Sequence, residues 1–250
     1  MIKSLFLRPL SIILILSFAT IAIVFILFNK SIEQEEIIFE DKEAKELLES
    51  NLSVLNQDFS GELKPISQDD HLRGEQGALV EIIFYADFNC PFSSEFFQTS
   101  QQLQQEFGDK IVIAFRHFPV DSLPNGVSAA LAAECSADQG KFWEMHDKLF
   151  ALKLDGGLNG IDFHDLAEEL DLEMTEFDRC FDEEKHVEKI YTQKEGALTA
   201  GAFGAPTIFV GEEIFPGAVP FEDYTDNEGV VQEGMKNIIE RQLSAAFLED

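Results

Sequence analysis

Cysteine is scarce in this sequence, and its three cysteines, Cys90, Cys135 and Cys180, lie far apart. There is no Cys-x-x-Cys pair, and the five histidines show no H-E-x-x-H spacing, so the patterns typical of zinc sites are missing. No glycine-rich phosphate loop occurs either. We therefore expect no metal and no other cofactor.

Basic residues are also few. Lys and Arg together number 18 against 47 Asp and Glu, which gives a formal net charge of −29. A nucleic-acid-binding protein needs a basic face, so this balance excludes nucleic acid as a partner. A solvated acidic surface explains the surplus more simply than a specific cation site does.

One long apolar run carries no charge. Residues 9–28 span 20 residues, about the length that a bilayer core needs. Because no small-x-small cleavage site follows the run and no cysteine lies near its end, we predict an uncleaved transmembrane signal anchor there. Residues 1–8 would form a short cytoplasmic tail, residues 29–68 an acidic stalk or linker, and residues 69–250 an extracytoplasmic domain.

The orientation of this anchor has an alternative. Lys3 and Arg8 precede the apolar run, and Lys30, Lys42 and Lys45 follow it. The difference in basic residues between the two flanks, which sets the orientation of a membrane segment, is therefore small. A domain that faces the cytoplasm and has a reducing role is the alternative.

The first half of the predicted domain has a strand–helix–strand pattern. Leu79–Tyr85 and Ile111–Phe115 are apolar, β-branched runs typical of buried strands, and Ser93–Phe107 is typical of a helix. A connection of this length predicts a βαβ unit with parallel strands.

The second half begins with a helical block, from about residue 122 to residue 201. A hairpin is expected at Thr207–Val210 and Glu213–Phe215, and a closing amphipathic helix at Val230–Phe247. Within the block we expect helices over 124–139, 141–152, 162–170 (with Asp162 as its cap) and 186–200, and another that begins at a Thr175 cap. The fold class is therefore α/β with an inserted helical domain.

Cys90 and Pro91 stand between the first strand and its helix. The unpaired N–H groups and the dipole at a helix start favour an anion, so a thiolate at Cys90 would be stabilised and reactive. Pro91 suits a first helical turn, because its missing N–H would have no partner there. The alternative is a small, inert core cysteine.

Five ordered segments carry a resemblance to a known family. They are 70–74 (DHLRG), 85–92 (YADFNCPF), 115–119 (FRHFP), 139–150 (QGKFWEMHDKLF) and 204–210 (GAPTIFV). In these segments the chain resembles the DsbA-like thioredoxin-fold oxidoreductases, especially their membrane-anchored bacterial branch.

The resemblance implies a fold and a set of site residues. It implies a thioredoxin fold with a helical insertion, Cys90 as the nucleophile, and a cis peptide bond at Pro206. Substrate would bind at Pro91, Phe92, Ala205 and Pro206. It also implies a structural disulfide between Cys135 and Cys180, to which the alternative is a pair of reduced core cysteines.

The active-site turn departs from the family pattern in its second thiol. Where the family has Cys-x-x-Cys, this sequence has Cys90-Pro91-Phe92-Ser93, so the resolving thiol is missing. Ser93 cannot displace a bound partner, although its hydroxyl could donate a hydrogen bond to the Cys90 sulfur.

Two further departures concern charge near the thiol. Phe84 stands where the family commonly has a buried Glu, and Phe92 where its most oxidising members carry His. Asp87 could replace the missing Glu, but a solvated turn residue is the simpler interpretation. His117 could face the thiol, although a structural hydrogen bond is favoured, and for His146 we expect a role in helix packing.

These observations predict a membrane-anchored, extracytoplasmic thiol–disulfide oxidoreductase with catalytic residues Cys90, Ser93 and Pro206. Its partners would be cysteine-containing extracytoplasmic proteins and a resolving thiol or redox partner, because a mixed disulfide at Cys90 needs an external thiol for release. The rival hypothesis is a redox-inactive DsbA-like binding or chaperone module, motivated by Ser93 and Phe84.

Overall fold

The computed structural model describes residues 61–249. The predicted cytoplasmic tail, the predicted transmembrane anchor and the predicted stalk up to residue 60 lie outside this part of the chain. Among the described residues, no helix is both long and apolar enough to cross a membrane. The predicted domain limits therefore stay predictions.

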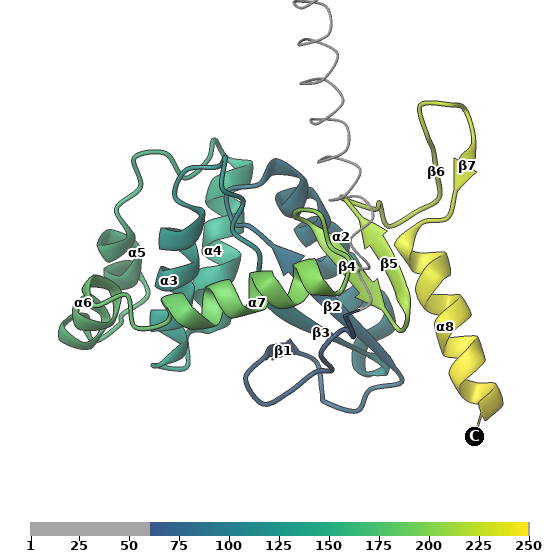
Figure 1. Cartoon of the computed structure of the whole chain (residues 1–250), viewed down its shortest axis with the longest axis horizontal. Helices are drawn as coiled ribbons and strands as arrows, with labels where there is room; N and C mark the ends of the chain where they lie inside the picture. Colours follow the sequence, from purple (N-terminus) through teal and green to yellow (C-terminus); the bar gives the residue numbers. More distant parts are fainter. Residues whose placement is uncertain (1–60, 250) are drawn as a thin grey trace, which may run out of the picture. The chain divides into compact units, whose positions relative to one another are not determined.

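A five-stranded mixed sheet forms the centre of the described region (Figure 1). Its strand order is β1-β3-β2-β4-β5, with β2 parallel to β3 and every other neighbouring pair antiparallel. The predicted βαβ unit and the predicted hairpin are both confirmed. The strands are β1 (His71–Arg73), β2 (Val80–Ala86), β3 (Ile111–His117), β4 (Thr207–Val210) and β5 (Glu213–Pro216).

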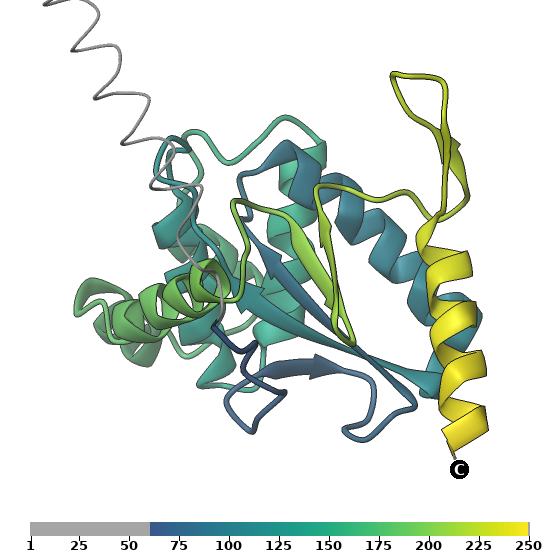
Figure 2. The same ribbon diagram turned by 45° about the vertical axis from the view of Figure 1, so that its right-hand side comes forward.

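Alternating side chains of the central strands bury both faces of this sheet. Along β2, Ile82 and Phe84 belong to one apolar cluster, whereas Ile83 and Tyr85 belong to another. The long helices α2 (Pro91–Phe107) and α8 (Met235–Glu249) lie side by side over the first face (Figure 2). Helix α7 (Val187–Thr199) crosses the second face. Burial on both faces explains why β2 and β3 are nearly continuous apolar runs.

Five helices form the insertion between β3 and β4, which confirms the predicted helical block. The Ala-rich α3 lies at its centre and contacts α4, α5, α6 and α7. Asp162 caps α5 as predicted, by accepting a hydrogen bond from the His164 N–H at 2.9 Å. The helices are α3 (Gly126–Ala137), α4 (Phe142–Leu154), α5 (Phe163–Glu169), α6 (Met174–Asp182) and α7, and a short 3-10 turn, η1 (Gly108–Lys110), precedes β3.

The sequence predictions were wrong at two helix starts. Glu173, not Thr175, caps α6, because the Glu173 carboxylate accepts from the backbone N–H groups of Thr175 and Glu176. The closing helix α8 begins at Met235 rather than Val230. The reason is a short ladder in which β7 (Val231–Gln232) pairs with β6 (Tyr224–Thr225) before the helix can start.

A buried arginine fixes the chain that leads into the sheet. Arg116 of β3 makes a bidentate pair with Asp70 at 2.7 and 2.8 Å and also donates to the carbonyl oxygens of Lys64 and Pro65. Burial alone would raise the pKa of Asp70, but its hydrogen bonds with Arg116 and Ser67 hold that pKa below the ordinary value. No local sequence pattern signals this long-range pair.

Candidate active site

Cys90 occupies the position at which β2 passes into α2. It is the N-cap residue of α2, with extended backbone angles, and Pro91 is the first helical residue. Its backbone N–H donates to the Asp87 carbonyl at 3.1 Å, and its own carbonyl accepts from Ser94. The local sequence accounts for this geometry, because proline tolerates the first turn, where no intrahelical acceptor is available.

The Cys90 thiol faces the chain just before β4. Its Sγ donates a hydrogen bond to the Ala205 carbonyl oxygen at 3.1 Å, across 115 residues of sequence. The Ala205–Pro206 peptide bond is cis, and Pro206 is buried. The structure therefore brings together three residues that the sequence analysis assigned to the site, although their catalytic and binding roles stay predictions. Cys90 is 5% exposed and is the free cysteine of the described residues.

Among the described residues, the Ser93 hydroxyl makes no hydrogen bond to the sulfur of Cys90. Its fully buried Oγ instead accepts a weak hydrogen bond from the backbone N–H of Asp87 at 3.4 Å. The hydrogen bond from Ser93 to the Cys90 sulfur, which the sequence left possible, is not among the hydrogen bonds of the described residues. The Ser93 hydroxyl instead satisfies a buried donor in the strand–helix turn.

Asp87 is buried, contrary to the simpler sequence interpretation of a solvated turn residue. Its side chain is only 2% exposed and accepts backbone N–H groups from Asn89 at 2.6 Å and Val120 at 2.7 Å. Burial raises the pKa of Asp87, although these two N–H groups favour its ionised form. The fit is tight, since a Cβ on Gly126 would lie 2.6 Å from Asp87 Oδ2.

Asn89 connects the active-site turn to the helical insertion. Its Nδ2 donates to the Pro124 carbonyl at 2.7 Å, and its Oδ1 accepts from Lys153 Nζ at 3.0 Å. Together with the Asp87–Val120 bond, these contacts fix the turn that carries Cys90. Sequence patterns gave no sign of this role for Asn89, which stands next to the cysteine.

The two phenylalanines near the motif differ in their environments. Phe84 is buried on β2 among the aromatic rings of Phe96, Phe115 and Phe150. No proton-carrying group therefore replaces the family's buried Glu at that position. Phe92 is 57% exposed at the start of α2, which leaves an apolar side chain on the surface beside Cys90.

The other two cysteines form a disulfide in the insertion. Cys135 of α3 and Cys180 of α6 are joined, with their Cα atoms 5.8 Å apart. Both side chains are buried. The bond connects two helices that otherwise pack through apolar contacts.

His117 belongs to a buried polar cluster rather than to the thiol site. Its Nε2 donates to Glu134 Oε1 at 2.9 Å, and the same carboxylate contacts His71 at 3.0 Å and Lys189 at 2.8 Å. Burial alone would raise the pKa of Glu134, but the His117 and His71 hydrogen bonds hold it far below the ordinary value. Burial lowers the pKa of His117. The contacts of His117 therefore agree with the structural hydrogen bond that the sequence favoured over a role at the thiol.

His146 lies among aromatic rings of α2, β3 and α4, in agreement with the expected packing role. Its ring meets those of Phe97, Phe115, Phe150 and Trp143 edge-on or nearly so. Its Nδ1 bonds to Asp147 at 2.8 Å, whereas its buried Nε2 has no partner in the described structure. Burial lowers the pKa of His146 to about 4.

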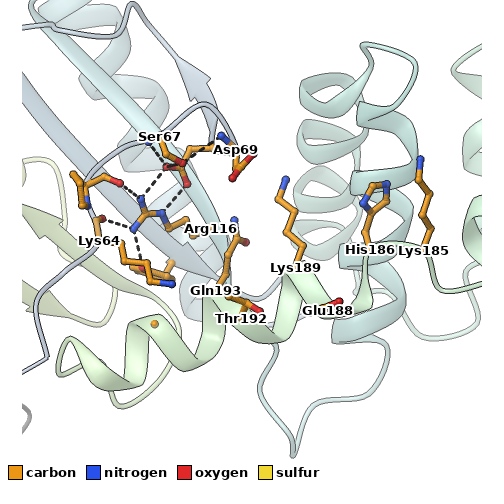
Figure 3. A pocket seen from close by; sticks show the side chains of 14 residues that line it. Lys64, Ser67, Asp69, Arg116, Lys185, His186, Glu188, Lys189, Thr192 and Gln193 are labelled. Atoms are coloured by element: carbon orange, nitrogen blue, oxygen red, sulfur yellow. Dashed lines mark hydrogen bonds and ion pairs between the residues drawn. The ribbon is translucent and has the colours of Figure 1, made fainter.

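A pocket of about 710 Å³ opens on the α7 side of the sheet (Figure 3). It lies between the chain at Lys64–Asp70 and α7, with Arg116 at its floor. Cys90 and Pro206 do not line it. Its cations are largely neutralised, because Arg116, Lys185 and Lys189 are each paired with a carboxylate. The pocket is therefore no part of the thiol site.

One group of metal-ligand side chains occurs in the part of the chain that the structure describes. Ligand atoms of Asp138, Cys180 and His186 lie within 4.8 Å of one another. The sulfur of Cys180 is engaged in the disulfide. The thiol site at Cys90 does not include these residues.

Comparison with known families assigns the fold. A family model described as "Thioredoxin" matches residues 67–227. The chain belongs to this thioredoxin family. The matched region contains the Cys90 turn, the whole helical insertion and the Ala205–Pro206 segment, so the predicted thioredoxin fold with a helical insertion is confirmed.

Solved structures of DsbA type share this fold. Wolbachia pipientis α-DsbA1 superposes with a TM-score of 0.58 at 22% identity, covering 75% of this chain and 96% of the neighbour. Oxidised BdbD from Bacillus subtilis superposes with a TM-score of 0.56 at 19% identity, covering 72% and 96%. These likenesses concern the fold, and they agree with the resemblance found in the sequence.

The chain also matches part of longer proteins that are named Na(+)/H(+) antiporters. The chain is 35% identical over 160 residues to Na(+)/H(+) antiporter NhaA 1 of Salinispora arenicola, covering 63% of this chain and 24% of the antiporter. The corresponding protein of Mycolicibacterium gilvum is 32% identical over 150 residues, again covering 24% of its length. The chain thus spans about a quarter of the length of these relatives.

Proposed function

We propose that this protein is a thiol–disulfide oxidoreductase that works through one active-site thiol, Cys90. The observation that carries the proposal is the placement of the Cys90 sulfur at the start of α2, 3.1 Å from the Ala205 carbonyl oxygen. Attack on a disulfide requires the thiolate form of this sulfur. An extended substrate segment beside Ala205 would bring its own disulfide to this sulfur.

The chemistry is thiol–disulfide exchange in two steps. The Cys90 thiolate attacks one sulfur of a substrate disulfide, a new S–S bond forms, and the other substrate sulfur leaves as a thiolate. A second thiol then attacks the mixed disulfide, and Cys90 leaves as a thiolate. Cys90 ends in its original oxidation state, so this cycle suits isomerisation, or reduction by an external thiol, better than net oxidation.

The need for an external thiol follows from Ser93. Its hydroxyl is held by the Asp87 N–H and carries no sulfur with which to displace a partner. The resolving group is therefore a small thiol or a cysteine of another protein. We propose cysteine-containing extracytoplasmic proteins as substrates.

We also propose that the domain is held at the extracytoplasmic side of a cell membrane by residues 9–28. The uncharged apolar sequence of that segment supports the anchor. The Cys135–Cys180 disulfide supports an oxidising compartment. The similarity gives no support for Na(+)/H(+) exchange by this chain, because the aligned region is only 24% of the antiporter.

A binding or chaperone module without redox activity is the second candidate. The buried Phe84 and the exposed Phe92 favour it, because the first puts an apolar ring where the family has a proton carrier and the second adds an apolar contact surface. It predicts substrate binding that does not depend on the Cys90 sulfur.

Exchange activity of the full-length protein distinguishes the two candidates. The assay follows the reaction of a fluorescent peptide disulfide with reduced glutathione, for the parent protein and for Cys90→Ala. We expect Cys90→Ala to lower the catalysed rate to that of the uncatalysed reaction. A Cys90→Ala rate equal to that of the parent overturns the proposal.

A further inference from the structure

A second sulfur-containing cluster lies in the helical insertion and takes no part in the exchange at Cys90. A carboxylate oxygen of Asp138, the sulfur of Cys180 and a ring nitrogen of His186 are mutually within 4.8 Å. His186 Nε2 is 3.0 Å from Asp138 Oδ2. Cys135 adds a fourth group, because its sulfur is bonded to that of Cys180.

These residues come from two sides of the insertion, with Asp138, Cys180 and His186 mutually close and Cys135 attached through its bond to Cys180. Cys135 lies in the last turn of α3 and Asp138 caps the end of that helix, so their spacing of three residues puts them on the same side. Cys180 lies in α6 and His186 is the N-cap of α7. The turn between them is closed by a hydrogen bond from the Lys185 N–H to the Cys180 carbonyl at 3.0 Å. Figure 3 shows His186 and Lys185 next to each other at the start of α7.

Two sulfurs, one imidazole nitrogen and one carboxylate oxygen are a zinc-type donor set. Zinc prefers four tetrahedral ligands of this kind. A sulfur binds zinc as a thiolate, so neither sulfur is available while the two cysteines are joined in a disulfide. The absence of a Cys-x-x-Cys pair does not exclude this site, since each side of it contributes one cysteine and one other ligand.

We propose that Asp138, Cys180 and His186, with Cys135 as the fourth ligand, form a zinc site that becomes available when the Cys135–Cys180 disulfide is reduced. The reductant is a dithiol, which gives two electrons and two protons to the disulfide and becomes a disulfide itself. Zinc then binds the two cysteine sulfurs and releases their two protons. The metal would replace the covalent link between α3 and α6, and would add a ligand from the α6–α7 turn.

One basic side chain competes with the metal. Lys185 Nζ lies 2.7 Å from Asp138 Oδ2, where its charge opposes a second cation. The Lys185 side chain is 55% exposed, so it can turn into solvent when the metal binds. The cluster is open to solvent through Asp138, while Cys180 is buried.

The insertion contains a matched cluster without sulfur. His164 pairs with Asp162 at 3.1 Å and with Asp178 at 3.6 Å. It offers an imidazole and two carboxylates in a similarly acidic environment but no thiolate. Because the protein carries a net charge of −29, such clusters are the proper control for unspecific cation binding.

The test uses Co²⁺ as a spectroscopic probe in full-length protein with Cys90→Ala, which removes the other thiol. Protein is reduced with a water-soluble phosphine, and Co²⁺ is titrated in excess Mg²⁺, which occupies oxygen-only sites. We expect a thiolate-to-cobalt charge-transfer band in the reduced protein and none in the oxidised protein. Zinc should abolish the band by displacement. A reduced protein without this band overturns the proposal.

Ligand variants then assign the site. His186→Ala and Asp138→Ala should each weaken Co²⁺ binding about 100-fold or more, since loss of a second-shell partner alone costs 10–100-fold. His164→Ala should leave the titration unchanged. Lys185→Ala should tighten binding, a gain that misfolding cannot produce. Equal affinity in His186→Ala and the parent contradicts the assignment.

Cys135→Ala gives a test that needs no reductant. This variant cannot form the disulfide, so Cys180 keeps a free thiol beside Asp138 and His186. When this change is combined with Cys90→Ala, we expect a Co²⁺–thiolate band in the untreated protein, with weaker affinity than in the reduced Cys90→Ala protein because one ligand is missing. Absence of the band in this variant contradicts the three-ligand core of the site.

Discussion

The two sulfur-containing regions of this domain have opposite surroundings. Cys90 has no cysteine partner and stands at the start of a helix, opposite the carbonyl of Ala205. Cys135 and Cys180 are joined to each other inside the helical insertion. Cys90, which has no sulfur partner, is therefore the candidate nucleophile. Cys135 and Cys180, which have each other as partners, form a structural link.

Two buried carboxylates also differ because of their hydrogen-bonding partners, in this case in the direction of their pKa shifts. Asp87 and Glu134 are each only 2% exposed. Burial raises the pKa of Asp87, whose bonded partners are backbone N–H groups. Burial favours the protonated form of Glu134 too, but its bonds to His117 and His71 lower the pKa. Equal burial thus leads to opposite shifts, and the hydrogen-bonding partners decide the direction.

Ser93→Cys should remove the chemical difference between Cys90 and an ordinary two-thiol site. The introduced thiol would displace a partner from Cys90 within the same turn, and an intramolecular attack of this kind is favoured by about 100-fold or more. We expect an internal disulfide between Cys90 and the introduced thiol, and net oxidation of a reduced peptide with glutathione disulfide as the oxidant. The parent should form only a glutathione adduct on Cys90 and no internal disulfide at that residue, as followed by intact mass and peptide mapping under non-reducing conditions. Net oxidation of equal rate in the parent would contradict the role given to Ser93.

Removal of the other two cysteines should affect stability and leave exchange unchanged. The disulfide closes a loop with a sequence separation of 45. The loop-closure model then predicts that a protein with both Cys135→Ala and Cys180→Ala loses about 4 kcal/mol of unfolding free energy. Denaturant titration measures this loss, and the peptide exchange assay is the control. A large loss of exchange in a folded double variant would show that the two regions are coupled.

Acid should destabilise the insertion through His146. Its pKa is about 4 in the folded protein and ordinarily 6.5, so the unfolded chain binds more protons between these values. The contribution of the neutral ring is complete above pH 6.5 and is lost as the pH falls toward 4. A shift of this size corresponds to roughly 3 kcal/mol.

The matched variant for this effect is His146→Gln, which does not titrate. The difference in unfolding free energy between the parent and this variant should change with pH between 6.5 and 4 and be constant above about pH 7. Denaturant titrations at several pH values measure it. A difference that is independent of pH over the whole range would contradict the assigned pKa.

Asp87→Asn should give the smallest effect, at the turn that carries Cys90. Asparagine has one acceptor oxygen, so one of the N–H groups of Asn89 and Val120 loses its partner. We expect a cost of about 1–3 kcal/mol in unfolding free energy and slower exchange at Cys90. The exchange rate should be measured under conditions in which the variant is folded. An unchanged rate would show that the Asp87 bonds do not position the thiol.

Local patterns in the sequence predicted most of the fold. The apolar runs of β2 and β3, the hairpin and the helices of the insertion can each be recognised from the spacing of apolar residues within a short stretch of sequence. The missed elements are short: β1, β6 and β7 contain two or three residues each, too few for a pattern. The late start of α8 depends on the pairing of β7 with β6, which is a tertiary contact.

The residues of the candidate site that belong to the family motif were predictable from the sequence. The contacts that these residues make with the rest of the chain were not. Cys90, Ala205 and Pro206 came from the motif, and the structure brings them together. The hydrogen bond from the Asp87 backbone N–H to the Ser93 hydroxyl and the burial of Asp87 both depend on the conformation of the turn. Contacts such as that of Asn89 with Lys153 join residues 64 positions apart, and no local pattern encodes them.

The lifetime of the mixed disulfide at Cys90 tests the central claim most directly. The full-length protein is treated with glutathione disulfide, freed of small molecules, and followed by intact mass and peptide mapping under non-reducing conditions. We predict a glutathione adduct on Cys90 that persists until an external thiol is added, because Ser93 cannot displace it. An adduct that disappears without added thiol, or that forms only on other cysteines, would contradict the account of Cys90 as a thiol that captures a partner and needs a second molecule to release it.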